Sequence, residues 1–415
     1  MKEKFIAIIG TLDTKGDQIE YLKEKIEEEG QSTCSINIGV SGEAPFKPTY
    51  DRDEVAQAAG TSIQEILEMN DRRAGMEKMG EGASSIIKEL YSKGELGGVF
   101  AVGGSQGTAA SLLIMKTVPL GVPKLVLSTI AYSPVIIPDL VGGVDLMMLP
   151  WVAGLWGLNS LSKQSLEMAA GAIAGAARAY MKRSVSRKKV VGVTSLGGAV
   201  NRYMNEIKPA LEDRGYEVAV FHVLGMPGRM YERSIADGLI DVSMDLSVGV
   251  ELLNEVTDGV YTAGAHRLEA AGEMGIPQIV SPGAIEAFHW GRDRPYPAKY
   301  EDRMRNWHNA VHMTVLSNAK EMAAVGDLMA EKLNRAKGPT AVVLPLQSMG
   351  PMPPHLTSPE AVEERKKGWS EFQRNIKSKL KPKIKYIEMD VTFNDPIYTN
   401  AVLDLFDEFQ TGNKA

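Results

Sequence analysis

Short, continuous apolar segments alternate with longer amphipathic segments along most of the chain. The first apolar segment, FIAIIG, spans residues 5–10, and a charged amphipathic segment follows it at once up to Gly30. Apolar runs without polar alternation are typical of strands that are buried on both faces, and their alternation with helices indicates parallel sheets covered by helices. The pattern therefore predicts an α/β protein built from doubly wound, Rossmann-like parallel sheets.

The same order of segments occurs twice in the chain. Residues 5–36 and residues 190–221 both show an apolar strand, a polar turn that contains glycine, a helix and a glycine before the next strand. Residues 98–131 and 259–286 form a second matching pair, in which Gly-Val-Pro or Gly-Ile-Pro precedes the following strand. The repeated order predicts two domains with one common plan.

The length of the chain agrees with two domains, because single cores stop growing at roughly 250–300 residues and the chain has 415. The polar, basic segment MKRSVSRKK at residues 181–189 is suited to a boundary. We therefore expect a Rossmann-like nucleotide-binding domain at residues 1–183 and a second Rossmann-like domain at residues 190–415.

Two segments depart from this plan. Residues 41–80 hold a loop with Pro45 and Pro48 before a helical stretch, and the chain from about residue 350 is rich in Pro, Lys and Glu. We expect this C-terminal segment to form a charged surface helix and to return to the second domain as a strand.

The net charge and the distribution of apolar residues argue against a nucleic-acid-binding protein and against a membrane protein. A net charge of −6 gives no basic surface of the kind that nucleic acid requires. The apolar stretch at residues 141–158 is broken by Gly, Asp and Pro, which disfavours a membrane span. Cys34 is the one cysteine, and its apolar neighbours predict a buried thiol. We expect a cytoplasmic protein that binds neither nucleic acid nor membrane.

Polar residues follow the first strand directly, in the turn from Gly10 to Gly16. Before a helix that we expect to start near Gly16, the turn offers two hydroxyls, a carboxylate and an ammonium, from Thr11, Thr14, Asp13 and Lys15. Phosphate binds well at a helix N-terminus, where N–H groups are unpaired. Lys15 would add positive charge and Asp13 would hold magnesium. Capping of the helix by Asp13 or Thr14 is the alternative.

Two further strand ends in the first domain carry glycines and hydroxyls. The stretch VGGSQGTAAS contains Gly103, Gly104, Ser105, Gly107 and Thr108, and LSTIA contains Ser128 and Thr129. Glycines let backbone amides approach an anion closely, although neither stretch matches the Walker or dinucleotide patterns. Ligands of open α/β sheets lie beyond the carboxyl ends of the strands. Three such ends predict one phosphate-binding crevice.

The second domain has a different set of polar strand ends. His222 ends a strand, Arg229 lies in the loop after it, and His266 and Arg267 follow another strand. An arginine beside a histidine would grip a carboxylate or phosphate. These four residues predict a second pocket for a small anionic metabolite, with ordinary polar surface loops as the alternative.

His308 and His312 stand four residues apart, a spacing that places both rings on one face of a helix. Zinc proteases use this spacing with a glutamate after the first histidine. Asn309 occupies that position, which argues against zinc hydrolysis.

Several stretches together resemble the family of the ATP-binding domain of the tomato mosaic virus resistance protein. They run in order from residue 5 to about residue 346 and include IGTLDTKG, GGSQGTA, GVPKLVLST, AGAHRLEAAGEMGIPQIVSPGAIE and RNWHNAVHMTVL. The resemblance implies two Rossmann-like subdomains, ATP with Mg²⁺ in the first, and a homodimer or higher homo-oligomer. Its nucleotide contacts carry over to Thr11, Asp13, Thr14, Lys15, Gly103, Gly104, Ser105, Gly107, Thr108, Ser128 and Thr129.

The leading expectation is thus a cytoplasmic protein that binds ATP and magnesium, with a second anionic-ligand pocket in the cleft between its domains. One alternative is an ATP-dependent ligase or kinase-type transferase acting on a small anionic metabolite. Another is a non-catalytic interaction protein that nucleotide stabilises. No residue in the sequence identifies a catalytic group.

Overall fold

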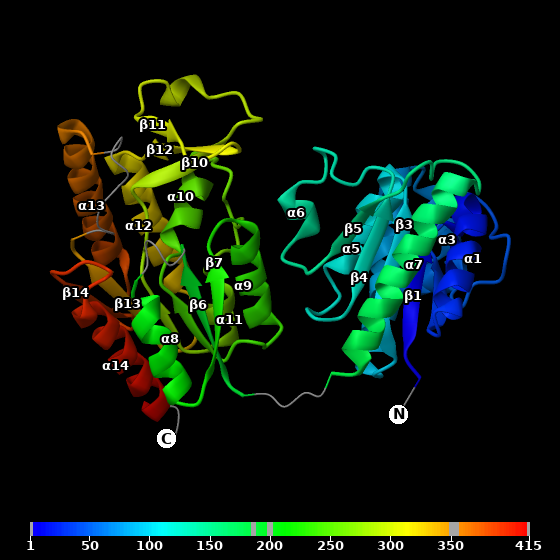
Figure 1. Ribbon diagram of the computed structural model, residues 1–415, viewed down its shortest axis with the longest axis horizontal. Coiled ribbons are helices and arrows are strands. Elements are labelled where there is room, and N and C mark those ends of the chain that lie inside the picture. Colours follow the sequence, from blue (N-terminus) through cyan, green and yellow to red (C-terminus); the bar gives the residue numbers. More distant parts are fainter. Residues whose placement is uncertain (1–2, 184–187, 197–201, 348–356, 413–415) are drawn as a thin grey trace. The chain divides into compact units, whose positions relative to one another are not determined.

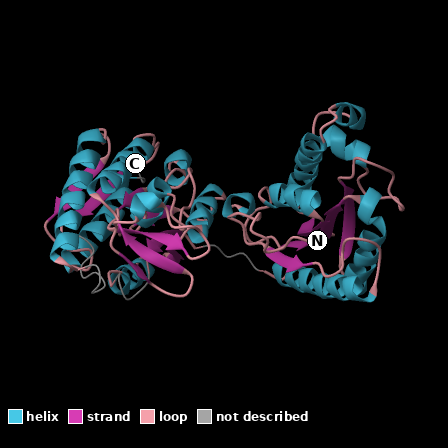
Figure 2. Cartoon of the chain, turned by 90° about the horizontal axis from the view of Figure 1, so that it is seen from above, coloured by secondary structure: helices cyan, strands magenta, loops and turns pink. Residues whose placement is uncertain are grey.

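The computed structural model describes residues 3–183, 188–196, 202–347 and 357–412 of the chain. It divides into two compact units, Met1–Val185 and Ser186–Ala415. In each unit helices lie on both sides of a central sheet (Figures 1 and 2). The α/β class with two doubly wound parallel sheets is thereby confirmed.

The first unit contains a five-stranded parallel sheet in the order β2-β1-β3-β4-β5. Its strands are β1 (Phe5–Gly10), β2 (Ser32–Asn37), β3 (Leu96–Gly103), β4 (Lys124–Ser128) and β5 (Met147–Pro150). In this order the chain turns back between β1 and β3, and such a switch point is where doubly wound sheets bind ligands.

Helices cover both faces of this sheet. They are α1 (Leu12–Glu28), α2 (Arg52–Ala58), α3 (Ile63–Glu68), α4 (Arg72–Ser92), α5 (Ser105–Met115), α6 (Pro138–Val141) and α7 (Ser160–Met181). Successive side chains of a strand point to opposite faces. Ile6 and Ile8 accordingly pack in the core with α1 and α7, whereas Ala7 and Ile9 pack with α4 and α5. Burial on both faces explains why β1 is apolar throughout.

The second unit repeats the plan. Its strands are β6 (Val190–Ser195), β7 (Glu217–His222), β8 (Val242–Asp245), β9 (Gln278–Val280), β13 (Thr340–Pro345) and β14 (Lys385–Met389). The order β7-β6-β8-β9-β13 matches that of the first sheet, and β14 is added at the edge beside β13. The repeated strand order predicted from the sequence is therefore present, but one of its predicted strands is not: residues 259–269 form no strand, β8 is the counterpart of β3, and His266 and Arg267 follow an irregular segment after α10.

The helices of the second unit are α8 (Met204–Asp213), α9 (Met226–Ala236), α10 (Gly249–Thr257), α11 (Ala270–Met274), α12 (Ala319–Leu333), α13 (Pro359–Lys379) and α14 (Pro396–Gly412), with a 3₁₀ turn η1 at Ala298–Tyr300. The charged helix α13 and the returning strand β14 confirm the prediction for the C-terminal segment; residues 348–356 of that segment lie outside the described residues. A small antiparallel sheet has the order β10-β12-β11, from Ala287–Gly291, His312–Leu316 and Arg305–Trp307.

Two local predictions were wrong. Helix α1 begins at Leu12 and not near Gly16, although non-helical backbone angles at Lys15 (φ −128°, ψ 15°) separate its first turn from the rest. His308 and His312 do not share a helix. His312 begins strand β12 and His308 lies in the connection after β11, so an antiparallel hairpin, not a helical turn, brings their rings together at 5.0 Å between centroids.

Two further sequence expectations concern burial and membranes. Cys34 is a free, buried thiol, as predicted, and burial raises its pKa to about 12. Across the described ranges, every helix is too short or too polar to cross a lipid bilayer.

Candidate functional site at the first switch point

Three polar turns follow neighbouring strand ends in the first sheet. In the register of the parallel strands, Ile9 pairs with Ala101 and Gly103 pairs with Ser128. The turns after β1, β3 and β4 therefore start side by side at one edge of the sheet. This edge is where the sequence predicted a phosphate-binding crevice.

The first turn of α1 is held from the neighbouring strand. Asn37, the last residue of β2, accepts a hydrogen bond from the Leu12 amide at 3.1 Å. Thr11 is the N-cap residue, but its side chain makes no cap bond and instead lies 2.8 Å from the Thr14 hydroxyl. Neither Asp13 nor Thr14 is the cap, so that alternative was wrong. Sequence reasoning missed this role of Asn37. The feature that could have indicated it is the position of Asn37 at a strand end, two residues before Gly39.

The carboxylate of Asp13 is only half satisfied. Its Oδ2 accepts a hydrogen bond from the Ser41 amide at 2.8 Å, whereas Oδ1 is buried and has no partner among the described residues. A Cβ on Gly39 would lie 2.6 Å from this Oδ1, so glycine is needed for the loop to pass so close. A buried carboxylate oxygen without a partner is costly, and a bound cation or ligand donor would satisfy it.

Lys15 does not point into the crevice. Its Nζ donates to the carbonyl oxygen of Gly154 at 2.9 Å and to that of Leu155, and it lies 5.3 Å from the ring centroid of Trp151. The side chain is buried, and burial lowers its pKa. In this arrangement the ammonium anchors the loop after β5, so the expected contact from Lys15 to phosphate is replaced by a structural one.

Some residues of the glycine-rich turn after β3 pack inside the first unit, whereas others remain accessible. A Cβ on Gly103 would lie 2.6 Å from the backbone carbon of Gly107, so these two glycines allow α5 to begin against the strand. The buried hydroxyls of Thr108 and Ser128 lie 2.6 Å apart and satisfy each other. These four residues hold the turn together.

Gly104, Ser105 and Thr129 are the members of the predicted set that remain accessible. Ser105 is exposed at the start of α5, and Gly104 and Thr129 are half-buried. The nearest atom to a Cβ built on Gly104 is the Thr129 Oγ1 at 3.8 Å, so the space above Gly104 is open. An anion approaching the N-terminus of α5 would meet these residues first.

The two glycines should respond differently to substitution. Gly103→Ala is expected to lower the free energy of unfolding of the first unit by about 1–3 kcal/mol, because the new methyl group overlaps backbone that cannot move. Gly104→Val is expected to leave folding intact while blocking the approach of an anion. Chemical denaturation measures the first effect and nucleotide titration the second. Equal stability of both variants would contradict the packing role of Gly103.

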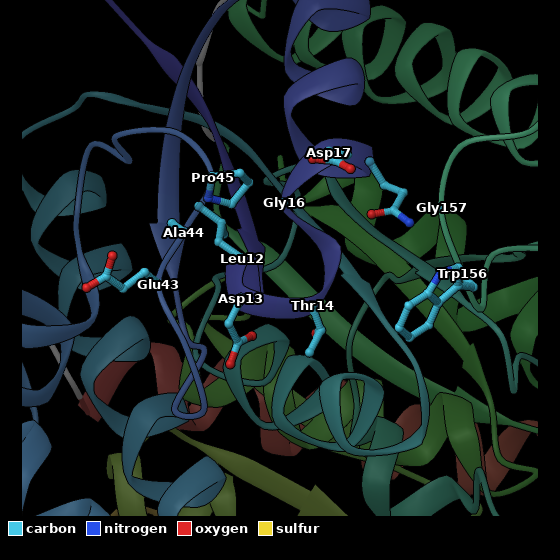
Figure 3. A pocket seen from close by; sticks show the side chains of 11 residues that line it. Leu12, Asp13, Thr14, Gly16, Asp17, Glu43, Ala44, Pro45, Trp156 and Gly157 are labelled. Carbon is cyan, nitrogen blue, oxygen red and sulfur yellow. The ribbon is translucent and has the colours of Figure 1, made fainter.

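A pocket of about 420 Å³ opens at the first turn of α1 (Figure 3). The residues that line it are Leu12, Asp13, Thr14, Gly16, Asp17, Gln18, Glu43, Ala44, Pro45, Trp156 and Gly157. Three of them are carboxylates, and within this described lining there is no lysine or arginine. The turns at 103–108 and 128–129 do not line it, so the structure joins the α1 turn to the loops at 43–45 and 156–157.

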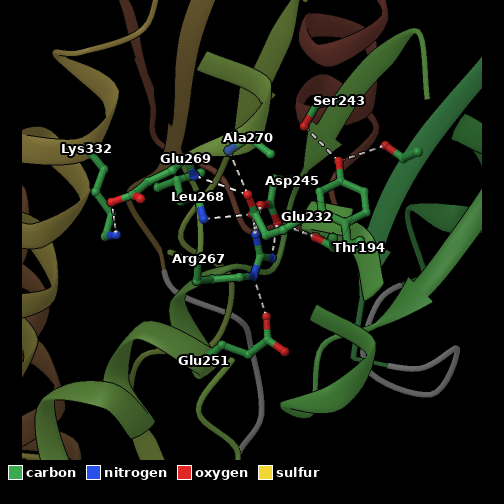
Figure 4. A network of polar contacts seen from close by, with 12 residues as sticks. Thr194, Glu232, Ser243, Asp245, Glu251, Arg267, Leu268, Glu269, Ala270 and Lys332 are labelled. Atoms are coloured by element: carbon green, nitrogen blue, oxygen red, sulfur yellow. Dashed lines mark hydrogen bonds and ion pairs between the residues drawn. The ribbon is translucent and has the colours of Figure 1, made fainter. Parts of the chain in front are cut away.

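The corresponding switch point of the second sheet is filled by a buried arginine (Figure 4). Arg267, which is 1% exposed, donates through Nη1 and Nη2 to Asp245 at the end of β8, at 2.5 and 2.8 Å. It also donates to Glu251 at 2.6 Å and to Glu232 at 2.8 Å. Thr194, at the end of β6, donates to the same Asp245 at 2.7 Å. The guanidinium is thus used within the unit, and the expectation that Arg267 grips a ligand requires correction.

The other three residues of the predicted second pocket contact different neighbours. His222 is exposed, with Nε2 3.1 Å from the Leu196 carbonyl oxygen. The side chain of His266 is 94% exposed and its Nδ1 lies 2.9 Å from Glu269. The Arg229 guanidinium lies close to Gly264. The pocket of about 220 Å³ beside Gly264 is lined by none of the four predicted residues.

Sequence reasoning missed a cluster of rings in the second unit. His289 on β10 lies 5.2 Å from His312 and 5.1 Å from Tyr261, between ring centroids, and the Tyr261 hydroxyl is 2.9 Å from His312 Nδ1. Burial, followed by the charges of His312 and His308, lowers the pKa of His289 to about 3. No three histidine, cysteine or acidic side chains in the described part of the chain are placed to hold one metal ion.

Comparison with known proteins agrees with this two-part organisation. A UPF0261 protein of Brucella suis is 36% identical over 407 residues, covering 97% of this chain and 95% of that protein. A UPF0261 protein of Clostridium tetani is 35% identical over 399 residues, covering 96% of this chain and 97% of that protein. The ToMV resistance protein Tm-1(GCR237) of Solanum lycopersicum is 26% identical over 424 residues, covering 96% of this chain and 55% of the tomato protein.

These matches confirm the relationship to the tomato proteins that the sequence indicated. The family models match in the same two parts, the N-terminal domain of the uncharacterised protein family UPF0261 at residues 4–182 and its C-terminal domain at residues 188–410. The chain therefore belongs to the UPF0261 family.

Proposed function

We propose that the first unit binds ATP as its magnesium complex at the switch point between β1 and β3. The observation that carries the proposal is the buried Oδ1 of Asp13, which has no partner among the described residues and belongs to a side chain that lines a pocket at the first turn of α1. Thr14 lines the same pocket, and its hydroxyl lies 2.8 Å from that of Thr11. Gly104, Ser105 and Thr129 are accessible at the neighbouring strand ends, and helix N-termini favour phosphate.

Magnesium fits the residues that are present. Mg²⁺ is usually held by one or two carboxylates together with waters and the phosphates of its substrate, not by a cage of protein ligands. Asp13 supplies one such carboxylate. Because the pocket is lined by Asp13, Asp17 and Glu43 without a basic side chain in its described lining, free polyphosphate would be repelled there. The metal complex is the form that this pocket suits.

The substitution Asp13→Asn tests the proposal. ATP with magnesium should raise the thermal midpoint of the parent protein, since a ligand at 100 times its Kd stabilises the native state by about 2.7 kcal/mol. ATP without magnesium should give little shift. In Asp13→Asn we expect at least about a tenfold loss of affinity for ATP with magnesium, because a charged metal ligand is lost, and an intact fold without ligand.

Glu20→Gln is the matched control, because Glu20 is an exposed carboxylate on the same helix and does not line the pocket. This variant should bind within about twofold of the parent. If Asp13→Asn binds ATP with magnesium as the parent does, the carboxylate holds only the Ser41 loop and the site is elsewhere.

A phosphoryl or ligase-type transfer to a small anionic metabolite is the alternative within the same site. It is favoured by the carboxylates of Asp17 and Glu43 beside the pocket, which offer acid–base groups next to the proposed phosphates. Release of ADP or AMP in the presence of a metabolite panel supports this alternative. Binding without turnover under all conditions supports a protein in which nucleotide only stabilises the fold or an assembly of chains.

A further inference from the structure

A tryptophan side chain stands almost uncovered at the rim of the pocket. Trp156 is 90% exposed and lines the pocket together with Thr14 and Leu12. Figure 3 shows it on one side of the pocket, with Glu43 and Ala44 on the other. Aromatic side chains contribute most when their faces are covered, so an exposed indole at a pocket rim indicates a surface that a ligand completes.

The chain just before Trp156 is held in place from α1. The ammonium of Lys15 donates hydrogen bonds to the carbonyl oxygens of Gly154 and Leu155. Gly154 packs directly on the buried ring of Trp151, where a Cβ would lie 2.1 Å from the ring. The backbone of the two residues that precede Trp156 is therefore held in place by the side chains of Lys15 and Trp151. A fixed loop lowers the cost of ordering an aromatic side chain when a ligand binds.

The polar and aromatic parts of the pocket are at different places. The first turn of α1 supplies Asp13 and the hydroxyl of Thr14, which suit a metal–phosphate group, whereas Trp156 supplies a flat apolar surface. A ligand that uses both parts has an anionic end and a planar ring. This is the chemistry of a nucleotide, and it is not that of a simple phosphate or a carboxylic acid.

We infer that Trp156 stacks on the base of the bound nucleotide and that Lys15 is the positioning residue that presents it. The inference rests on the proposed function and adds the residue that selects an aromatic ligand. Stacking depends on the π-face that all bases share. The site is therefore expected to accept ATP and GTP with similar affinity and to bind tripolyphosphate more weakly than either.

The test measures binding by calorimetry, with magnesium throughout, for ATP and for inorganic tripolyphosphate. For Trp156→Ala we expect about a tenfold loss of ATP affinity, with tripolyphosphate affinity unchanged. Trp156→Phe should recover most of the loss because a ring is restored. Leu155→Ala is the matched control: Leu155 is 75% exposed in the same loop but does not line the pocket, so this variant should bind ATP as the parent does.

The possible contrary results distinguish failure of the stacking role from failure of nucleotide binding. If the parent binds ATP and tripolyphosphate equally well, or if Trp156→Ala binds ATP as the parent does, the stacking role is wrong while nucleotide binding stands. If Trp156→Ala loses both ligands equally, the side chain only shapes the loop and the inference is overturned. If the parent binds neither ligand, the inference falls together with the proposed function.

Discussion

Replacing Arg267 with methionine is expected to lower the free energy of unfolding of the second unit by about 3–5 kcal/mol, since removal of one partner leaves buried charges uncompensated. Arg267 is the cation that Asp245, Glu251 and Glu232 share. The loss is large against a typical total stability of about 5–15 kcal/mol. Urea denaturation followed by circular dichroism measures it.

Two further variants show whether the loss of stability comes from the buried guanidinium of Arg267. Arg267→Lys keeps the charge but replaces a planar fork of donors with one ammonium, so it should fold with intermediate stability. Arg335→Ala is the control, because Arg335 is 64% exposed and pairs with Glu331 on the surface; its effect should stay within about 0.5 kcal/mol. If Arg267→Met is as stable as the control, the carboxylates bind protons instead and the guanidinium is not needed for folding.

The second unit should also lose stability in acid because of His289. Burial and the nearby His312 and His308 lower its native pKa to about 3, whereas an unfolded histidine titrates near 6.5. Below about pH 6.5 the unfolded chain therefore binds a proton at this histidine that the native state does not bind. The free energy of unfolding falls as the pH is lowered from about 6.5 to about 3. Between pH 7 and 4.5 the expected loss from this group is about 2–3 kcal/mol.

The contribution of His289 is isolated by comparing variants across pH. In His289→Gln the acid-dependent loss should shrink by the amount given above. Glu251 acts in the opposite direction: burial raises its pKa to about 7, so its contribution is lost as pH rises through that value. A parallel pH profile for His289→Gln and the parent would contradict the role of His289.

The architecture could be predicted because it depends on local and periodic features of the sequence. The apolar residues 5–10 predicted a strand buried on both faces, and Ile6 and Ala7 indeed pack under different helical layers. The repeat of strand, turn and helix predicted the repeated strand order. Such features are set by neighbours within a few residues, so they are visible in one sequence.

The direction of long polar side chains could not be predicted in the same way. Lys15 donates to carbonyls about 140 positions later in the chain, and Arg267 finds its three carboxylates on α9, β8 and α10. Lys15 stands just after a strand, and the sequence predicted the same for Arg267, although the segment before it is irregular in the structure. Ligands also bind at strand ends, so the sequence pattern was the same for a structural and a ligand-binding role. The spacing of His308 and His312 misled for a related reason, because a hairpin and a helix both bring residues four apart into contact.

The Arg267 cluster makes the counter-ion of the second switch point part of the polypeptide. Dialysis, chelators and changes in metabolite supply cannot remove a cation that is covalently attached, so the carboxylates of this cluster keep their counter-ion in every preparation of the protein. At the first switch point, Asp13 carries a buried Oδ1 that has no partner among the described residues. Loss of the nucleotide proposed for the first unit would therefore make that unit alone more open to proteases, because the second unit carries its own counter-ion.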